Sequence, residues 1–208
     1  MDAMDILADC RVVPVVVIED QESAVELAVT LLDAGIQAIE VTLRTPSALA
    51  AIEQIAKHVP DILVGAGSVR QASHFSQIAD AGAQFAVSPG ASEALISGAK
   101  HAQMPYVPGA ASASEILFLL EQGYELQKFF PAELGGGTAM LKALSAPLPE
   151  VKFFPTGGVT AQLAASYLQL PCVHCIGGTW IATPNLIASG DFRQIGELAK
   201  AALDIAGG

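Results

Sequence analysis

Lys128 lies in an apolar segment, Leu126-Gln-Lys-Phe-Phe-Pro-Ala132, whose composition is typical of a buried strand. Burial among aromatic residues disfavours a charged ammonium, so a lysine in such a segment keeps more of the neutral amine that attacks carbonyl carbons. One interpretation is therefore a lysine that forms a Schiff base. The other is a lysine near the start of the strand whose ammonium reaches water, and the segment taken alone favours this second interpretation.

A second lysine has the same local surroundings, because Lys128-Phe-Phe-Pro131 recurs as Lys152-Phe-Phe-Pro155. Glu150 would balance the charge of Lys152, and the segment that begins at Lys152 ends in a glycine-rich loop with a different expected role. These points favour Lys128 as the nucleophile. Composition alone does not exclude Lys152 as the nucleophile.

Polar residues alternate along another strand-like segment, 38–44. Side chains of a strand alternate between its two faces, so Glu40, Thr42 and Arg44 share one face and apolar residues form the other. If the apolar face packs on helices, the polar face lines an interior in which an unpaired charge is unfavourable. Arg44 suits a substrate carboxylate, and the deeper Glu40 suits proton exchange near neutral pH. The alternative is a structural Glu40–Arg44 ion pair, although the two Cα atoms of an extended strand would be about 13 Å apart.

Apolar segments rich in Val, Ile and Phe, with the character of strands, recur roughly every 20 to 26 residues. They cover 12–18, 38–43, 62–67, 85–90, 106–110, 126–132, 152–158 and 172–178. Amphipathic patterns between them predict helices over 22–34, 47–58, 72–81, 93–103 and 114–122, with a shorter one over 138–144 after three glycines.

Right-handed crossovers between these segments make successive strands parallel. The pattern therefore predicts an α/β fold, a single-domain (β/α)8 TIM barrel with a short N-terminal helix. An open doubly wound sheet is the alternative, because the sixth helix is short.

Composition narrows the class of protein. The chain has 208 residues, 52% hydrophobic and 15% charged, which suits one α/β domain, 1–208, whose central strands are buried on both faces. Its net charge of −11 argues against nucleic acid or an anionic membrane as a partner and favours a small molecule. An anionic ligand would need local positive potential from placed cations or helix N-termini.

Other features bear on compartment and metals. The acidic N-terminus lacks the basic and apolar regions of a secretory signal, and no apolar run has the length of a membrane span. Three cysteines argue for a reducing cytosol, so we expect a cytoplasmic protein. Cys172-Val-His-Cys175 is spaced like a metal clip, but strand alternation turns Cys175 away from the other two, and we expect no metal there.

A (β/α)8 barrel carries its chemistry at the carboxyl ends of its strands. Three of these ends are small or turn-forming and leave room for a ligand: Gly65-Ala-Gly-Ser-Val69, Val87-Ser-Pro-Gly90 and Val107-Pro-Gly-Ala110. The last two strands end in glycine-rich loops, Pro155-Thr-Gly-Gly158 and Ile176-Gly-Gly-Thr-Trp180. Such loops before helices are typical of phosphate sites in barrels, and simple tight turns are the alternative.

Over nearly its whole length the chain resembles the 2-keto-3-deoxy-6-phosphogluconate (KDPG) and 4-hydroxy-2-oxoglutarate (KHG) aldolases. The resemblance rests on motifs in the family's order and spacing: Glu40-Val-Thr-Leu-Arg-Thr45, Gly65-Ala-Gly-Ser-Val69, Ser88-Pro-Gly90, Lys128-Phe-Phe-Pro-Ala132, Pro155-Thr-Gly-Gly158 and Gly177-Gly-Thr-Trp180.

This resemblance implies roles for individual residues. Lys128 would be the Schiff-base lysine and Glu40 the general acid/base, which decides between Lys128 and Lys152. The remaining implied residues are Arg44 and Ser68 at the substrate carboxylate, Thr42, Pro89 and Phe130 in the substrate pocket, and Thr156, Gly157, Gly158, Gly178 and Thr179 at the phosphate. Three positions depart from the family's commoner residues: Ser68 and Ser112 replace threonine, and Thr179 replaces serine.

The resemblance also implies a metal-independent class I aldolase, a lyase without an organic cofactor, usually a homotrimer. It would cleave KDPG to pyruvate and glyceraldehyde 3-phosphate in the Entner-Doudoroff pathway. KHG would be a further substrate, cleaved to pyruvate and glyoxylate. Two alternatives keep the barrel: a sugar-phosphate isomerase or epimerase with Glu40 as the carbon base, and a non-catalytic sugar-phosphate sensor.

Overall fold

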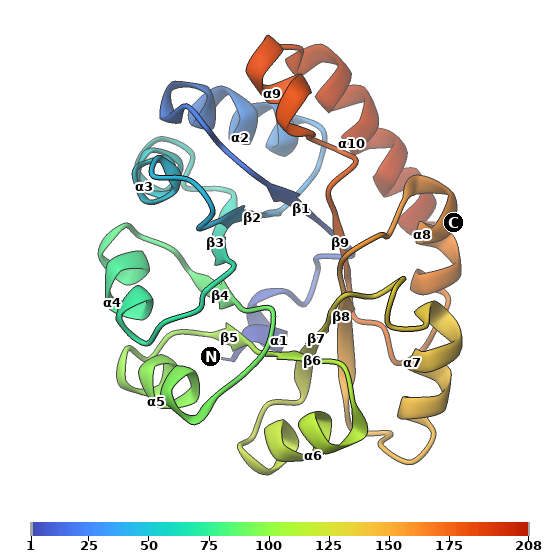
Figure 1. The fold of residues 1–208 in the computed structure, drawn as a ribbon. Coiled ribbons are helices and arrows are strands. Elements are labelled where there is room, and N and C mark those ends of the chain that lie inside the picture. Colours follow the sequence, from blue (N-terminus) through green and yellow to red (C-terminus); the bar gives the residue numbers. More distant parts are fainter. Residues whose placement is uncertain (1, 208) are drawn as a thin grey trace.

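Strands and helices alternate along the chain, and the strands curl into a parallel barrel with the helices outside (Figure 1). The computed structural model describes residues 2–207, so the two terminal residues of the expected domain 1–208 lie outside the described residues. The strands are β1 (Val12–Val16), β2 (Ala38–Thr42), β3 (Leu63–Gly67), β4 (Phe85–Val87), β5 (Tyr106–Val107), β6 (Gly109–Ala110), β7 (Leu126–Phe129), β8 (Lys152–Pro155) and β9 (Ile176–Gly178).

Each helix that the sequence pattern predicted is present, and further helices follow residue 160. They are α1 (Ala3–Ile6), η1 (Gln21–Ser23), α2 (Ala24–Asp33), α3 (Ala48–His58), α4 (Ser73–Asp80), α5 (Glu93–His101), α6 (Ala113–Glu121), α7 (Gly137–Ser145), α8 (Ala161–Leu168), α9 (Pro184–Ser189) and α10 (Phe192–Gly207). The doubtful sixth crossover helix forms as α7, and the helix expected over 22–34 begins with the 3-10 turn η1. The last barrel unit carries two helices, α9 and α10.

The barrel closes, which rejects the open-sheet alternative. Parallel pairing joins six strands in the order β5-β4-β3-β2-β1-β9 and three in the order β6-β7-β8. Isolated bridges Phe153↔Val173 and Thr156↔Gly177 connect β8 to the segment of β9. The fifth barrel strand is divided into β5 and β6 at Pro108, whose nitrogen has no proton to donate to a ladder.

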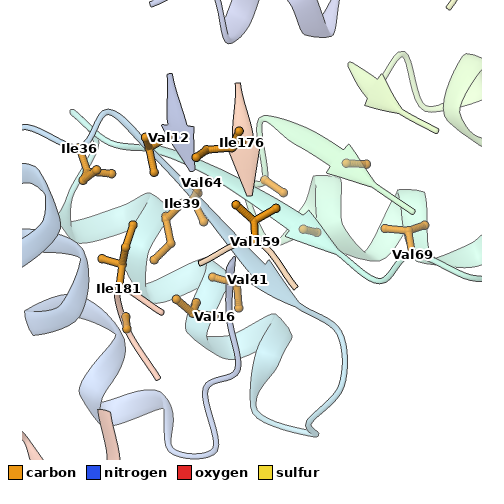
Figure 2. Packing of buried hydrophobic residues seen from close by; sticks show 14 of the residues in the cluster. Val12, Val16, Ile36, Ile39, Val41, Val64, Val69, Val159, Ile176 and Ile181 are labelled. Carbon is orange, nitrogen blue, oxygen red and sulfur yellow. The ribbon is translucent and has the colours of Figure 1, made fainter. Parts of the chain in front are cut away.

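Hydrophobic residues form two cores. The larger lies between the strands and the surrounding helices, and Figure 2 shows part of it around Val16, Ile39, Val41 and Val64. The smaller, here called the inner core, lies inside the barrel toward the amino ends of the strands and includes Leu7, next to α1. Between them the side chains of each strand are buried on both faces, as the apolar segments predicted.

Across residues 2–207, every helix is too short or too polar to cross a membrane.

Candidate active site

A buried ion pair lies inside the barrel. Lys128 Nζ on β7 donates to Glu40 Oε1 on β2 at 3.3 Å, and the exposed fractions of the two residues are 5% and 0%. The alternative interpretation, in which the ammonium of Lys128 reaches water, is therefore wrong. The structural Glu40–Arg44 pair is also wrong, because Glu40 pairs across the barrel and not along its own strand.

Glycines of β3 make the room that Glu40 occupies. Glu40 pairs with Gly65, and a Cβ at Gly67 would overlap the Glu40 carboxylate. A Cβ at Gly65 would overlap the ring of Phe85 in the same way. The sequence suggested that these glycines leave room for a ligand near the backbone. In the structure, the space beside them is filled by the side chains of Glu40 and Phe85.

One carboxylate oxygen of Glu40 takes no part in the ion pair with Lys128. Among residues 2–207, Oε2 is buried and accepts no hydrogen bond. A buried polar atom without a partner costs about 1–3 kcal/mol. Such an atom beside an amine is suited to exchange a proton with a small molecule that enters the barrel.

Lys152 has different surroundings from Lys128, although the two motifs match. It is the first residue of β8, it is half-buried, and its Nζ donates to the carbonyl of Pro171 at 2.9 Å. Its ammonium therefore lies at the amino end of the barrel, away from Glu40. Tertiary structure separates two lysines that composition could not.

Arg44 and Ser68 meet at the carboxyl ends of β2 and β3. Strand β2 ends at Thr42, so Arg44 lies in the following turn and not on the strand as expected. Its Nε donates to Ser68 Oγ at 3.2 Å, and its side chain is exposed. Ser68 has a φ of 58°, an unusual conformation for a residue other than glycine. The pair presents a guanidinium and a hydroxyl at the barrel mouth.

Thr42 connects two strands. Its side chain is buried, and its Oγ1 donates to the carbonyl of Val16 on β1 at 2.9 Å. The hydroxyl proton is therefore used within the protein. What Thr42 offers the barrel interior is its methyl group and the oxygen lone pairs.

Phe130 and Pro89 flank the region of Lys128. The ring centroid of half-buried Phe130 lies 5.4 Å from Lys128 Nζ, within the range of a cation–π contact. The backbone of Pro89 lies over Gly109, the β6 residue paired with Lys128, and a Cβ at Gly109 would overlap it. Both expected pocket residues therefore adjoin the lysine strand or its neighbour.

Sequence reasoning missed the residues that hold Pro89. Ser88 is fully buried, its Oγ donates to the carbonyl of Gly90 at 2.6 Å, and it shares a hydrogen bond of 2.5 Å with the Tyr106 hydroxyl. Burial raises the pKa of Tyr106, which keeps this hydroxyl protonated. In the sequence, Ser88 is part of a strand end and of the Ser88-Pro-Gly90 motif, and neither indicates a contact with Tyr106.

The two glycine-rich loops lie side by side. The bridge Thr156↔Gly177 joins their second residues, and the hydroxyl of buried Thr156 faces Gly177 and has no hydrogen-bond partner among residues 2–207. Gly157 and Gly158 have φ of 99° and 83°, which other residues rarely adopt. Helix α8 begins three residues after Gly158, so its N-terminus points toward this loop.

In the second loop, Gly178 is buried and Thr179 is exposed. A Cβ at Gly178 would crowd the ring of Trp180, which explains why a glycine precedes this tryptophan. All five residues expected at a phosphate thus lie in two adjoining loops at one end of the barrel.

The segment 172–175 does not gather a metal-binding group. His174 Nε2 lies 2.9 Å from the carbonyl of Leu7, while Cys175 is fully buried in the inner core. Burial raises the pKa of the Cys175 thiol. Within residues 2–207, no group of three or more His, Cys, Asp or Glu side chains is placed to hold a metal ion.

Comparison with known proteins gives one consistent family. The family described as KDPG and KHG aldolase matches residues 3–198. The chain is 41% identical over 202 residues to the KHG/KDPG aldolase of Escherichia coli strain K12, with 97% of this chain and 95% of that protein covered.

Solved structures agree. A KDPG aldolase from Legionella pneumophila, with pyruvate captured as a covalent carbinolamine intermediate, has a TM-score of 0.94 and 42% identity over 97% of this chain and 98% of that one. The KDPG aldolase of Zymomonas mobilis ZM4 with 3-phosphoglycerate has a TM-score of 0.89 and 40% identity, covering 97% and 94%.

Proposed function

This chain belongs to the KDPG and KHG aldolase family, and on that premise we propose that it is a class I aldolase that cleaves KDPG to pyruvate and glyceraldehyde 3-phosphate. The observation that carries the proposal is the buried pair of Lys128 and Glu40 inside the barrel. An amine and a carboxylate at this separation supply the nucleophile and the proton carrier that imine chemistry needs. The reaction places the enzyme in the Entner-Doudoroff pathway.

The first half of the reaction forms the imine. Lys128 attacks as the neutral amine, and Glu40 Oε1, 3.3 Å from Nζ, is placed to accept the ammonium proton. The amine adds to the C2 ketone of the substrate and gives a carbinolamine. Glu40 returns this proton to the carbinolamine hydroxyl, which leaves as water, so that Glu40 is again a carboxylate and Lys128 carries a protonated imine that withdraws electrons from C3.

The second half breaks the carbon–carbon bond. Glu40, through a water, removes the proton of the C4 hydroxyl, and the C4 carbonyl forms as the C3–C4 bond breaks. The electron pair of that bond moves into the enamine, and glyceraldehyde 3-phosphate leaves. The enamine takes a proton at C3, and hydrolysis of the resulting imine releases pyruvate and restores the Lys128 amine.

Other residues hold the two ends of the substrate. Arg44 and Ser68, bonded to each other at the mouth, bind the carboxylate, while Thr42, Pro89 and Phe130 shape the pocket around the imine. Thr156, Gly157, Gly158, Gly178 and Thr179 bind the phosphate through backbone N–H groups and hydroxyls. Fixing both ends keeps C2 against Lys128.

Three further properties belong to this proposal. KHG is a second substrate, cleaved to pyruvate and glyoxylate, since the Escherichia coli relative carries both names. The enzyme acts in the cytoplasm without a metal or an organic cofactor. It assembles as a homotrimer, which light scattering would test by the mass of the particle in solution.

Borohydride trapping tests the mechanism. We expect sodium borohydride with pyruvate to leave a reduced pyruvyl adduct on the peptide that contains Lys128. The Lys152→Arg variant should trap pyruvate as the wild type does, and Lys128→Met should not. If the folded wild-type protein gave no adduct at Lys128, the aldolase mechanism would be abandoned in favour of an isomerase or a sugar-phosphate sensor.

A further inference from the structure

Two residues outside the proposed site connect the lysine strand to the glycine-rich loop. Beyond the end of β7, the N–H of Ala132 donates to the carbonyl of Thr156 at 2.9 Å, and the N–H of Glu133 donates to the carbonyl of Gly157 at 3.0 Å. The chain after Lys128 therefore stays paired with the loop of 156–158 after both strands have ended.

The side chain of Glu133 continues this connection. It lies against Gly158, where a Cβ would come within 2.7 Å of Glu133 Cβ, so that only a glycine fits at this point. The Glu133 carboxylate accepts a hydrogen bond from the Tyr167 hydroxyl. Tyr167 is fully buried on α8, the helix that follows the loop. Glu133 thus contacts the loop and the helix that follows it.

The hydroxyl of Tyr167 is a permanent donor in this arrangement. Burial, the hydrogen bond to Glu133 and the negative charge of Glu133 all raise the pKa of Tyr167. A protonated phenol bonded to a carboxylate forms a charge-assisted hydrogen bond, which is stronger than a neutral one.

We propose that Glu133 and Tyr167 are positioning residues for the phosphate end of the substrate. They fix the loop of 156–158 and the start of α8 at a set distance from β7, the strand that carries Lys128. Neither residue needs to touch the substrate. The inference rests on the proposed function, since it concerns where the phosphate lies when C2 is bonded to Lys128.

The Tyr167→Phe variant tests the pair, because it removes one hydroxyl and keeps the buried ring. Tyr124→Phe is the matched control: Tyr124 is half-buried between α6 and β7, and no hydrogen bond of its hydroxyl is recorded in the described chain. We expect Tyr167→Phe to raise KM for KDPG about tenfold, the loss that one charge-assisted bond predicts. KM for KHG, which has no phosphate, should change less than about twofold, and Tyr124→Phe should change neither.

Variants of Glu133 give a second measurement. Glu133→Gln keeps an oxygen that accepts from Tyr167 but loses the charge, so it should raise KM for KDPG less than Glu133→Ala, which should raise it as Tyr167→Phe does. An equal rise in KM for KDPG and KHG would show a general structural role and overturn the inference, and so would unchanged KM for KDPG in both Tyr167→Phe and Glu133→Ala.

A binding measurement separates this inference from the catalytic proposal. Calorimetry with glycerol 3-phosphate, which has a phosphate and no carboxylate or ketone, reports on the phosphate end alone. We expect Tyr167→Phe to weaken this binding about tenfold while borohydride trapping of pyruvate is unchanged. Unchanged glycerol 3-phosphate binding would refute the positioning role, and absence of the pyruvate adduct in the wild type would refute the aldolase mechanism.

Discussion

Lys128 Nζ lies 3.3 Å from Glu40 Oε1, although the two residues are 88 positions apart and belong to strands that do not pair with each other. Their meeting depends on closure of the barrel, which turns the inward faces of β2 and β7 toward a common centre. It also depends on Gly67, whose missing side chain leaves space for the Glu40 carboxylate. The position of the Lys128 amine is therefore determined by the whole ring of strands.

The Lys128–Glu40 pair should be coupled in stability. Lys128→Met or Glu40→Gln leaves one buried charge without its partner, which costs up to roughly 3–5 kcal/mol. The double variant leaves no buried charge and should recover a large part of the loss. Urea unfolding of the four proteins measures this, and losses that simply add would show that the two side chains do not interact.

Glu40 should matter more for turnover than for substrate binding. We expect Glu40→Gln to lower kcat for KDPG by about 100-fold or more, because positioned proton transfer contributes 10²–10⁴-fold. Glu53→Gln on the exposed face of α3 is a control that also removes one carboxylate charge. Steady-state rates decide, and a Glu40→Gln enzyme with a wild-type kcat would remove Glu40 from the mechanism.

Gly67→Ala should lower stability and activity, whereas the same substitution at Gly90 should be tolerated. The new Cβ would overlap the Glu40 carboxylate, and overpacking of this kind costs about 1–3 kcal/mol. Gly90→Ala is the control, because a Cβ there meets nothing within 4 Å. Melting temperature and kcat should fall for Gly67→Ala only. Equal effects at the two positions would contradict the packing account.

Ser68 should act on the carboxylate end of every substrate. Ser68→Ala removes the hydroxyl that accepts from Arg44, and we expect KM for KDPG and KHG to rise together by roughly 3- to 10-fold. Ser68→Thr keeps the hydroxyl, but a β-branched residue at a φ of 58° should lower stability by about 1 kcal/mol. A Ser68→Ala effect confined to KDPG would instead place Ser68 near the phosphate.

Alkaline pH should destabilise the fold through Cys10. Burial and then the nearby charge of Asp9 raise the pKa of this thiol from 9.0 to about 11. Between these values the unfolded chain loses the Cys10 proton and the folded chain keeps it, so the free energy of unfolding falls as pH rises through this window. Urea unfolding from pH 8 to 11 should show a smaller fall for Cys10→Ala than for the wild type.

Local sequence patterns predicted the barrel well. Each strand is buried on both faces, so its apolar residues are continuous, and the alternation in β2 correctly turned Glu40 and Thr42 inward. The turn after Thr42 was not visible, because Leu43 and Arg44 continue the alternation although the strand has ended. The segment 106–110 was expected as one strand, and the structure divides it into β5 and β6 at Pro108.

Contacts between distant segments were beyond the sequence. Nothing near Glu133 or Tyr167 indicates that the two side chains meet, and Ser88 gives no sign of Tyr106. The Lys128 and Lys152 motifs also show that local sequence does not determine long-range contacts. Identical neighbours along the chain lead to a buried ion pair in one case and a bond to a carbonyl at the barrel's amino end in the other.

Helix α1 and the residues after it close one end of the barrel. Leu7 joins the inner core, its carbonyl contacts His174, and Arg11 donates to the carbonyls of His174 and Leu168. Figure 1 shows α1 crossing behind the ring of strands. This closed end lies opposite the carboxyl ends of the strands, where Arg44, Ser68 and the two glycine-rich loops lie. Residues that lie outside the proposed site therefore determine from which side a substrate reaches the Lys128–Glu40 pair.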